Sequence, residues 1–282
     1  MRIAEALLCS KQLEEVSDSS RLDTELLLCH VLDKRTSYLM TWPDKPLLVS
    51  QQQQFLTLMG RRSKGEPIAY ILGTQAFWTL DLEVSTDTLI PRADTEVLVE
   101  TALSLFANVP FLDRSCRVAD LGAGTGAIAL ALASERPAWE VWGCDRIEAA
   151  VALAQRNQKR LGLTQVSFVQ GSWLEPLSGL FDMIVSNPPY IDSRDEHLDQ
   201  GDVRFEPRSA LVADGDGLSD IQHIISAATD YLVTDGWLLF EHGYQQGSAV
   251  RQLFTECGYQ QVNTYQDYAG NDRVTLGCWR IG

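Results

Sequence analysis

The segment Arg117-Val-Ala-Asp-Leu-Gly122-Ala-Gly124-Thr-Gly126 joins a short apolar strand to an Ala-rich helix through three glycines. Glycine permits a tight turn and lets a ligand approach the backbone, whose amides at the helix start can face polar groups. The spacing is G-x-G-x-G and differs from the G-x-G-x-x-G of dinucleotide enzymes. The segment therefore predicts a ligand-binding α/β domain, although such turns also arise for packing alone.

Helix and strand patterns alternate on both sides of this segment, and we expect a doubly wound, mostly parallel, Rossmann-like sheet of seven strands. The predicted strands cover residues 117–121, 140–144, 166–170, 182–186, 237–241, 260–266 and 273–279, and the predicted helices 94–106, 126–134, 147–161, 218–233 and 246–257. The link before the last strand contains Gly270 and Asn271, which predicts a C-terminal hairpin with one antiparallel strand. Ligands bind such sheets beyond the carboxyl ends of the strands.

The chain before this domain has two other patterns. Residues 1–64 carry apolar residues three and four positions apart, which predicts a small N-terminal helical bundle. Residues 65–92 begin with the turn formers of Gly65-Glu-Pro-Ile-Ala-Tyr-Ile-Leu-Gly73, and polar and apolar residues alternate from Phe77 to Val84. We interpret this stretch as a linker with a β-hairpin. Residues 93–282 then form the α/β domain.

Charge and composition exclude several classes of protein. The net charge is −15, and the first 64 residues hold nine Lys and Arg against eight Asp and Glu, so the acidity belongs to the rest of the chain. An acidic surface repels phosphate backbones, so we expect no binding to free nucleic acid. Charged residues interrupt the N-terminus, and no apolar run reaches membrane-spanning length, which predicts a cytoplasmic protein without a membrane partner. Scattered cysteines and histidines predict neither a disulfide framework nor a metal site.

Two further residues favour a cofactor that contains a nucleoside. Asp145 ends the strand that follows the glycine-rich turn, where a carboxylate can accept hydrogen bonds from both ribose hydroxyls. A lone strand-end Asp could equally cap the next helix. Trp173 follows the third strand and could cover an adenine ring, or else pack in the core.

The most specific motif is Asn187-Pro-Pro-Tyr190, which follows an apolar strand directly. The two prolines remove backbone donors and stiffen the turn. The side-chain oxygen of Asn187 and the carbonyl of Pro188 could accept both hydrogens of one –NH2 group, while Tyr190 packs against its planar face. The alternative is a rigid loop with a capping Asn.

This arrangement suits methyl transfer to a planar nitrogen. An amide nitrogen is a weak nucleophile, and the motif contains no obvious strong base. Two acceptors on the –NH2 hydrogens would favour the positive charge that develops on nitrogen during attack on a sulfonium methyl group. The proton can leave after the transfer.

These motifs resemble class I S-adenosylmethionine-dependent methyltransferases that act on planar nitrogens. More narrowly, the chain resembles the HemK/PrmC family of release factor glutamine methyltransferases. The similarity extends to the 65–73 stretch, Leu89-Ile-Pro-Arg92, Asp94-Thr-Glu96 and Asp202-Val-Arg-Phe-Glu206-Pro207. The resemblance implies S-adenosyl-L-methionine as the cofactor and methylation of N5 of the glutamine in the Gly-Gly-Gln motif of peptide chain release factors. It also implies that the N-terminal helical domain helps to dock the release factor.

The resemblance also implies roles for individual residues. The cofactor contacts would be Gly122, Ala123, Gly124, Thr125, Gly126, Asp145 and Trp173, together with Asn187, which would touch both ligands. Asn187, Pro188, Pro189 and Tyr190 would bind the glutamine, and Asn187, Pro188 and Tyr190 would be catalytic, with no metal. Ser172 stands where the family often has an acidic residue, which puts a carboxylate contact to the adenine in doubt. No role follows for Arg92, Arg204 or Glu206.

Three alternatives stay open from the residues themselves. A nucleic-acid adenine or cytosine N-methyltransferase would use the same Asn-Pro-Pro-Tyr motif, but the acidic charge disfavours it. A non-catalytic cofactor-binding adaptor would have no need of the amine-binding motif. A dehydrogenase is disfavoured by the glycine spacing.

Overall fold

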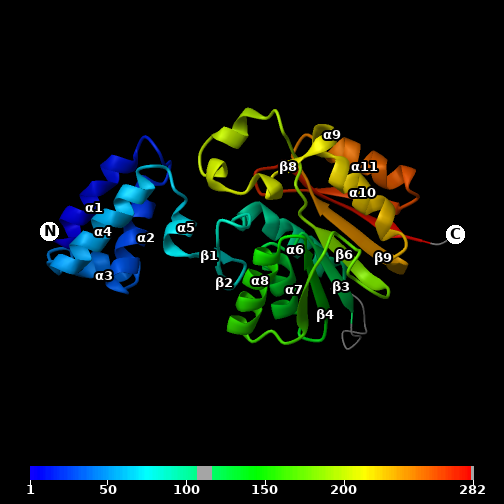
Figure 1. The fold of residues 1–282 in the computed structure, drawn as a ribbon, viewed down its shortest axis with the longest axis horizontal. Helices are drawn as coiled ribbons and strands as arrows, with labels where there is room; N and C mark the ends of the chain where they lie inside the picture. Colours follow the sequence, from blue (N-terminus) through cyan, green and yellow to red (C-terminus); the bar gives the residue numbers. More distant parts are fainter. Residues whose placement is uncertain (107–115, 281–282) are drawn as a thin grey trace. The chain divides into compact units, whose positions relative to one another are not determined.

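The computed structural model describes residues 1–106 and 116–280, and it divides into two compact units (Figure 1). The first unit contains Met1–Thr74 and a later segment, Glu196–Phe205, and the second contains Gln75–Asp195 and Glu206–Gly282. Residues 65–74 therefore lie in the N-terminal unit, whereas we had expected them in a linker. The sequence also gave no sign that the 196–205 segment packs with this unit.

The first unit is a helical bundle. Its elements are α1 (Ile3–Leu7), a 3₁₀ helix (Leu8–Leu13), α2 (Ser20–Leu32), α3 (Thr36–Thr41), α4 (Val49–Arg62) and α5 (Ile68–Leu72), with 3₁₀ turns at Glu196–Asp199 and Val203–Phe205. Leu27 and Leu28 of α2 and Phe55 of α4 are fully buried at its centre. Burial of one face of each helix stabilises such short helices, which would be marginal alone.

The second unit is built on the seven-stranded sheet that the sequence predicts. Its strands are β3 (Arg117–Leu121), β4 (Glu140–Asp145), β5 (Val166–Gln170), β6 (Phe181–Ser186), β9 (Leu232–Glu241), β10 (Gln260–Gln266) and β11 (Asp272–Trp279). Their order is β10-β11-β9-β6-β3-β4-β5. β11 runs antiparallel to both its neighbours, and the remaining pairs are parallel. The predicted fold class, with its C-terminal antiparallel hairpin, is confirmed.

Helices cover both faces of this sheet (Figure 1). The helices α6 (Glu96–Leu105), α7 (Ala127–Glu135) and α8 (Glu148–Leu161) pack against strand residues such as Val118 on one face. The helices α10 (Ser219–Ala228) and α11 (Gly247–Glu256) pack against the neighbouring strand residue, Ala119, on the other. Successive side chains of a strand point to opposite faces of the sheet. The unbroken apolar runs of the central strands therefore place apolar side chains on both faces, and helices bury both.

The structure differs from the sequence prediction between residues 218 and 241. The helix predicted to reach residue 233 ends at Ala228, and β9 begins five residues earlier than expected. The backbone N–H of Phe181 donates to the Tyr231 carbonyl at 2.8 Å, and Leu232 pairs with Phe181. A left-handed residue, Asp235, then shifts the register of the strand. Pairing with β6 thus places residues 232 and 233, which the local pattern assigned to the helix, in a strand.

Short paired segments complete the second unit. The hairpin expected within residues 65–92 is present as β1 (Thr74–Phe77) and β2 (Leu80–Glu83). β7 (Ile191–Asp192) and β8 (Val212–Ala213), joined by a parallel pairing, were not predicted. A four-residue helix, α9 (Asp214–Gly217), follows β8.

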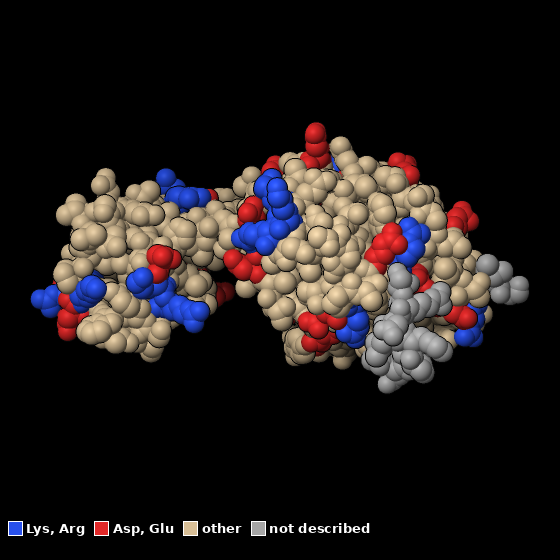
Figure 2. All heavy atoms as spheres, turned by 90° about the horizontal axis from the view of Figure 1, so that it is seen from below, with Lys and Arg blue, Asp and Glu red and all other residues tan. Residues whose placement is uncertain are grey.

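Acidic and basic side chains are interspersed on the face that Figure 2 shows, over both units. Among the residues that the structure describes, none of the helices combines the length and the apolar character that a membrane span requires.

Candidate active site

A cleft opens in the second unit beyond the carboxyl ends of the parallel strands, as expected for this sheet topology. Its empty space is ≈ 900 Å³, a volume that includes open solvent at the mouth. The lining comes from the segments after four strands and from two other loops: Gly122–Thr125, Cys144–Ile147, Gly171–Trp173, Asn187 with Pro189, Asp87–Leu89 with Pro91, and Ser209 with Ala210; Thr95, Ala127 and Ile128 complete it. The structure thus brings most of the predicted site residues together.

The glycine-rich turn forms one wall of the cleft. Gly122, Gly124 and Gly126 all have left-handed backbone angles, with φ of 73°, 55° and 82°, which favour glycine. A Cβ atom at Gly126 would lie 2.7 Å from the Phe168 ring. Gly126 is outside the cleft lining, and the absence of a side chain there lets the turn pack against Phe168.

Asp145 links the glycine-rich turn to the start of α8. Its Oδ2 accepts a hydrogen bond from the Gly124 backbone N–H at 2.9 Å, and its Oδ1 accepts one from the Ile147 N–H at 2.9 Å. The carboxylate therefore joins the glycine-rich turn to the residue before α8 without capping the helix, and it lines the cleft. A carboxylate has about four lone-pair positions, so acceptor capacity remains for a ligand.

Trp173 packs beside the glycine-rich turn at the cleft. Its backbone is left-handed, with φ of 49°, a conformation that costs energy for a bulky residue. Its ring lies over Gly122, because a Cβ atom added there would be 3.4 Å from the ring. The ring is partly exposed and lines the cleft beside Ser172.

The Asn-Pro-Pro-Tyr turn begins where β6 ends. The Ser186 hydroxyl donates to the Leu121 carbonyl at 2.7 Å, which ties this strand end to β3. The Asn187 Nδ2 donates to the Thr95 Oγ1 at 3.2 Å. Pro188 is buried and lies outside the cleft lining, whereas Pro189 is part of it.

Tyr190 also lies outside the cleft lining. Its hydroxyl donates to Glu241 Oε1 at 3.2 Å. Burial, followed by the nearby Glu241 charge, raises the pKa of Tyr190 well above its usual range. The ring is therefore neutral at physiological pH and available for packing.

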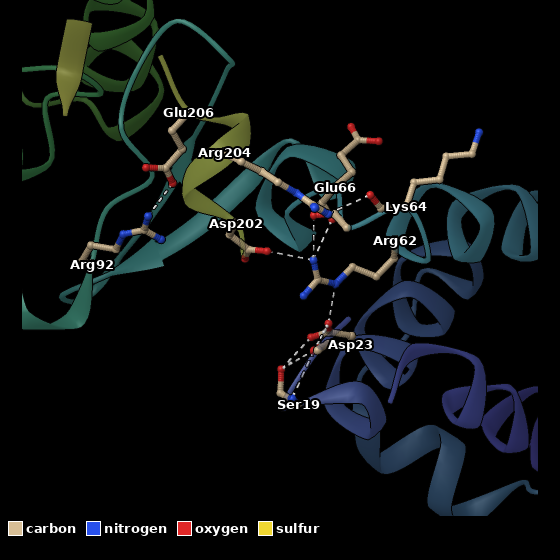
Figure 3. A network of polar contacts seen from close by, with 11 residues as sticks. Ser19, Asp23, Arg62, Lys64, Glu66, Arg92, Asp202, Arg204 and Glu206 are labelled. Carbon is tan, nitrogen blue, oxygen red and sulfur yellow. Dashed lines mark hydrogen bonds and ion pairs between the residues drawn. The ribbon is translucent and has the colours of Figure 1, made fainter. Parts of the chain in front are cut away.

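An ion pair joins two segments that line the cleft. Arg92 follows Pro91, and Glu206 precedes Ser209, which are both lining residues. The Arg92 Nη2 lies 2.6 Å from Glu206 Oε1, and the Glu206 side chain is fully buried (Figure 3). This pairing supplies the structural role that the sequence left open for both residues.

Some cleft residues were not predicted. Thr95 stands within the Asp94-Thr-Glu96 motif that carried the family resemblance, so a signal was present without a role. Ile128, Arg146 and Ser209 were not predicted either; Ile128 and Arg146 lie next to predicted motifs in the sequence, whereas Ser209 reaches the cleft only through the fold.

Comparison with known proteins supports both units. Residues 8–73 match the model of the PrmC N-terminal domain, and residues 95–268 match that of the methyltransferase small domain. In solved structures, a methyltransferase from Pyrococcus furiosus has a TM-score of 0.54 at 18% identity, covering 80% of this chain and 99% of its own. At that identity the match shows the fold alone.

Two relatives match nearly the whole chain. The release factor glutamine methyltransferase of Salmonella typhimurium is 56% identical over 262 residues, which cover 93% of each chain. The protein of the same name from Pseudomonas aeruginosa is 54% identical over 274 residues, 97% of each chain. The chain therefore belongs to the release factor glutamine methyltransferase family.

Proposed function

We propose that this protein transfers a methyl group from S-adenosyl-L-methionine to the side-chain amide nitrogen, N5, of the glutamine in the Gly-Gly-Gln motif of peptide chain release factors. The observation that carries the proposal is the Asn187 amide at the cleft. Its Nδ2 is engaged by Thr95, which leaves its Oδ1 as an acceptor for an incoming –NH2 group.

The cleft fits a nucleoside-bearing methyl donor. The Asp145 carboxylate is placed to accept hydrogen bonds from ribose hydroxyls with the lone pairs that Gly124 and Ile147 leave free. Trp173 offers an aromatic face to the adenine, and the backbone at Gly122 lets the donor approach closely. Ala123 and Thr125 line the same wall. The bound donor supplies the electrophilic methyl group.

The chain's own residues act by positioning the amide. Asn187 Oδ1 and the Pro188 carbonyl accept the two hydrogens of the substrate –NH2, and Tyr190 and Pro189 pack against the amide plane. These acceptors favour the positive charge that forms on nitrogen as the N–C bond forms and the S–C bond breaks. The nitrogen then loses one proton to solvent, which leaves a neutral N-methyl amide.

The N-terminal unit is proposed to help dock the release factor. Its match to the PrmC N-terminal domain supports this role. The substrate also implies the cytoplasmic location expected from the sequence, because release factors act during translation.

The test uses labelled donor and purified release factor. The protein is incubated with radiolabelled S-adenosylmethionine and a factor from cells that lack this methylation, and the label is located by proteolysis and mass spectrometry. We expect the label on the glutamine of the Gly-Gly-Gln motif and none on a factor with Ala at that position. Label on adenine or cytosine of parallel RNA and DNA samples would instead support the nucleic-acid alternative.

A further inference from the structure

One side-chain amide, that of Gln246, holds the end of the Asn-Pro-Pro-Tyr turn. Gln246 directly precedes α11 and is partly exposed. Its Nε2 donates to the Tyr190 carbonyl at 3.1 Å and to the Asp216 carbonyl at 3.1 Å. Its Oε1 accepts the Gly243 backbone N–H at 2.9 Å. A single side chain thus joins the segments that follow β6, β8 and β9.

These three partners fix the direction of the Gln246 amide. A backbone N–H only donates and a backbone carbonyl only accepts. Gly243 therefore requires the amide oxygen, whereas Tyr190 and Asp216 each require a hydrogen of the –NH2 group. A glutamine amide has two such hydrogens, and both are used here. Only one orientation of the amide satisfies all three bonds.

The sheet fixes the backbone segment to which the Gln246 oxygen is bonded. The His242 N–H donates to the Arg273 carbonyl at 3.0 Å, which continues the pairing of β9 with β11. The ring of His242 is buried, with Nδ1 2.9 Å from the Gly243 carbonyl and Nε2 2.8 Å from Thr275 Oγ1. Because a carbonyl only accepts, Nδ1 carries a proton and donates it to Gly243.

The Tyr190 carbonyl is closely packed as well as bonded. A Cβ atom added to Gly217 of α9 would lie 2.1 Å from the Tyr190 carbonyl oxygen and 2.7 Å from Gln246 Nε2. Gly217 is buried and has a left-handed φ of 79°, which favours glycine. The carbonyl therefore lies against α9 at a position where only glycine leaves room for it.

The start of the turn is fixed by a second hydrogen bond. The Ser186 hydroxyl is fully buried and donates to the Leu121 carbonyl at 2.7 Å. Between the two ends, Pro188 and Pro189 have φ angles that their rings restrict to about −65°. Because this segment is stiff, holding both of its ends also sets the direction of the Pro188 carbonyl and the plane of the Tyr190 ring.

We infer that Gln246 is a positioning residue for methyl transfer, which holds the Tyr190 carbonyl so that the Pro188 carbonyl and the Tyr190 ring meet the substrate amide in the productive geometry. This inference rests on the proposed function. Gln246 lies outside the cleft lining, so it acts through the main chain of the turn. A displacement of about 1 Å can cost up to about 10²-fold in rate, so we expect its loss to appear in kcat.

The experiment compares two substitutions of similar length at this position. Gln246→Met removes all the polar groups, whereas Gln246→Glu keeps the acceptor for Gly243 and loses both donors. We expect each to lower kcat about tenfold, with the release factor KM and the donor Kd changed by less than about twofold. Gln245→Met and Gln245→Glu change the adjacent, exposed glutamine. They are the matched controls and should retain the wild-type kcat.

Measurements of folding separate positioning from a general loss of structure. Circular dichroism and thermal unfolding must first show that each variant is folded. A wild-type kcat in folded Gln246→Met would overturn the inference. Parallel losses of kcat, donor affinity and thermal stability would also overturn it, because they would indicate a structural role alone. If Gln246→Met does not fold, Gln246→Glu and its control decide by the same criteria.

A readout without turnover tests the hydrogen bond to Tyr190. Tyrosine labelled with ¹³C at the carbonyl, combined with ¹⁵N-labelled isoleucine, gives NMR signals only from Tyr-Ile pairs, and the chain has two, Tyr70-Ile71 and Tyr190-Ile191. In Gln246→Met, the second signal, identified by its absence in Tyr190→Phe, should shift. The Tyr70-Ile71 signal comes from the first unit and should stay in place. An unshifted Tyr190-Ile191 signal would overturn the inference.

The assays also separate failure of this inference from failure of the proposed function. A wild-type protein that does not methylate release factors would overturn the proposed function, and the inference with it. A wild-type protein that methylates them, together with an unchanged kcat in Gln246→Met, would overturn the inference alone.

Discussion

A buried network around Arg62 in the first unit contrasts with two buried carboxyls near the cleft of the second unit. In the first unit, the Arg62 guanidinium is bonded to Asp23 at 2.7 Å, to Asp202 at 3.0 Å and to the Gly65 and Glu66 carbonyls (Figure 3). Asp23 in turn accepts the hydroxyls of Ser17 and Ser19. In the second unit, two buried carboxyls near the cleft, Asp120 and Glu241, each keep one oxygen without a hydrogen-bond partner.

We interpret the paired Arg62 group as structural and the incompletely paired carboxyls near the cleft as typical of a functional site. A fully paired buried charge fixes an arrangement, because breaking any bond leaves an uncompensated charge. Asp202 lies 140 positions from Arg62 in the sequence, so that arrangement includes the attachment of the 196–205 segment to the N-terminal helices. An incompletely paired carboxyl costs stability and is expected where ligand binding and catalysis impose other requirements.

Removing the Arg62 guanidinium, which bonds Asp23 and Asp202, should give the largest loss of stability. Arg62→Met leaves Asp23 and Asp202 without their cation, and we expect a loss of about 3–5 kcal/mol in the stability of the first unit. Hydrogen exchange measured by mass spectrometry should increase together in α2, α4 and residues 196–205. The strands of the second unit should keep their protection.

The neighbouring arginine provides the control for that experiment. Arg61 pairs with Glu66 at the surface, where an ion pair contributes about 0–1 kcal/mol. Arg61→Met should therefore leave the exchange pattern nearly unchanged. If the two substitutions behaved alike, or if residues 196–205 stayed protected in Arg62→Met, the network would not hold this segment.

At the cleft, Asn187→Ala should affect rate more than stability. It removes the acceptor proposed for the substrate –NH2, and we expect kcat to fall by ~10²-fold, the scale of one lost transition-state hydrogen bond, with a smaller change in KM. Asn187→Asp keeps an acceptor but adds a charge and loses the donor to Thr95, so it should retain more activity than Ala and less than the wild type. Thermal unfolding must first match the parent. If folded Asn187→Ala turned over at the wild-type rate, Asn187 would have no catalytic role and the Asn-Pro-Pro-Tyr turn would serve only the structure.

Asp145 combines a proposed role in cofactor binding with hydrogen bonds that hold the local structure. Removing its carboxylate in Asp145→Ala should weaken S-adenosylmethionine binding by about 1.5–3 kcal/mol, the range for hydrogen bonds to a charged group. Calorimetry measures this change. Since Asp145 also accepts bonds from Gly124 and Ile147, thermal unfolding of the variant shows how much of the effect is structural. An unchanged donor Kd would leave Asp145 with a structural role alone, through its bonds to Gly124 and Ile147.

Sequence alone predicted the parts of the site that are local in the chain. The glycine-rich turn, Asp145 and Asn187 were found because each directly follows a strand and carries its chemistry in a short motif. The hydrogen-bond partner of Asn187 was not found, because Thr95 is 92 positions away in the sequence. Glu241, which accepts the Tyr190 hydroxyl, follows β9, whose place beside β6 depends on the register of the two strands. No local pattern encodes such a register.

The same limit applies to the fold. Alternating patterns predicted all seven strands of the sheet, but the early start of β9 depends on pairing with Phe181. Residues 196–205 belong to the first unit, where Asp202 pairs with the buried Arg62. Neither feature has a periodic signal, because both depend on contacts between residues far apart in the chain.

The smallest effect should appear in the pH dependence that Asp120 imposes. Burial, and then the Asp145 charge, raise the pKa of Asp120 to about 7. The folded protein therefore holds a proton that the unfolded chain releases near its ordinary pKa of about 4. Stability should fall as pH rises between these two values and level off above pH 7. Asp120→Asn mimics the protonated form, so its stability relative to the wild type should rise by about 1 kcal/mol or more from pH 5 to pH 8.

Urea unfolding at several pH values measures how the stability difference between Asp120→Asn and the wild type changes with pH. This change does not depend on any pH-independent destabilisation by the added –NH2 group. Asp230→Asn, a change at an exposed carboxyl, is the control and should give a flat difference. Because Asp145 contributes to the raised pKa of Asp120, the Asp120→Asn difference should flatten at lower pH in an Asp145→Ala background. A flat difference in the wild-type background would mean that Asp120 is charged throughout this range. A retained proton would then not explain the unpaired oxygen of Asp120. Glu241 would be the one carboxyl left in the comparison with the paired Arg62.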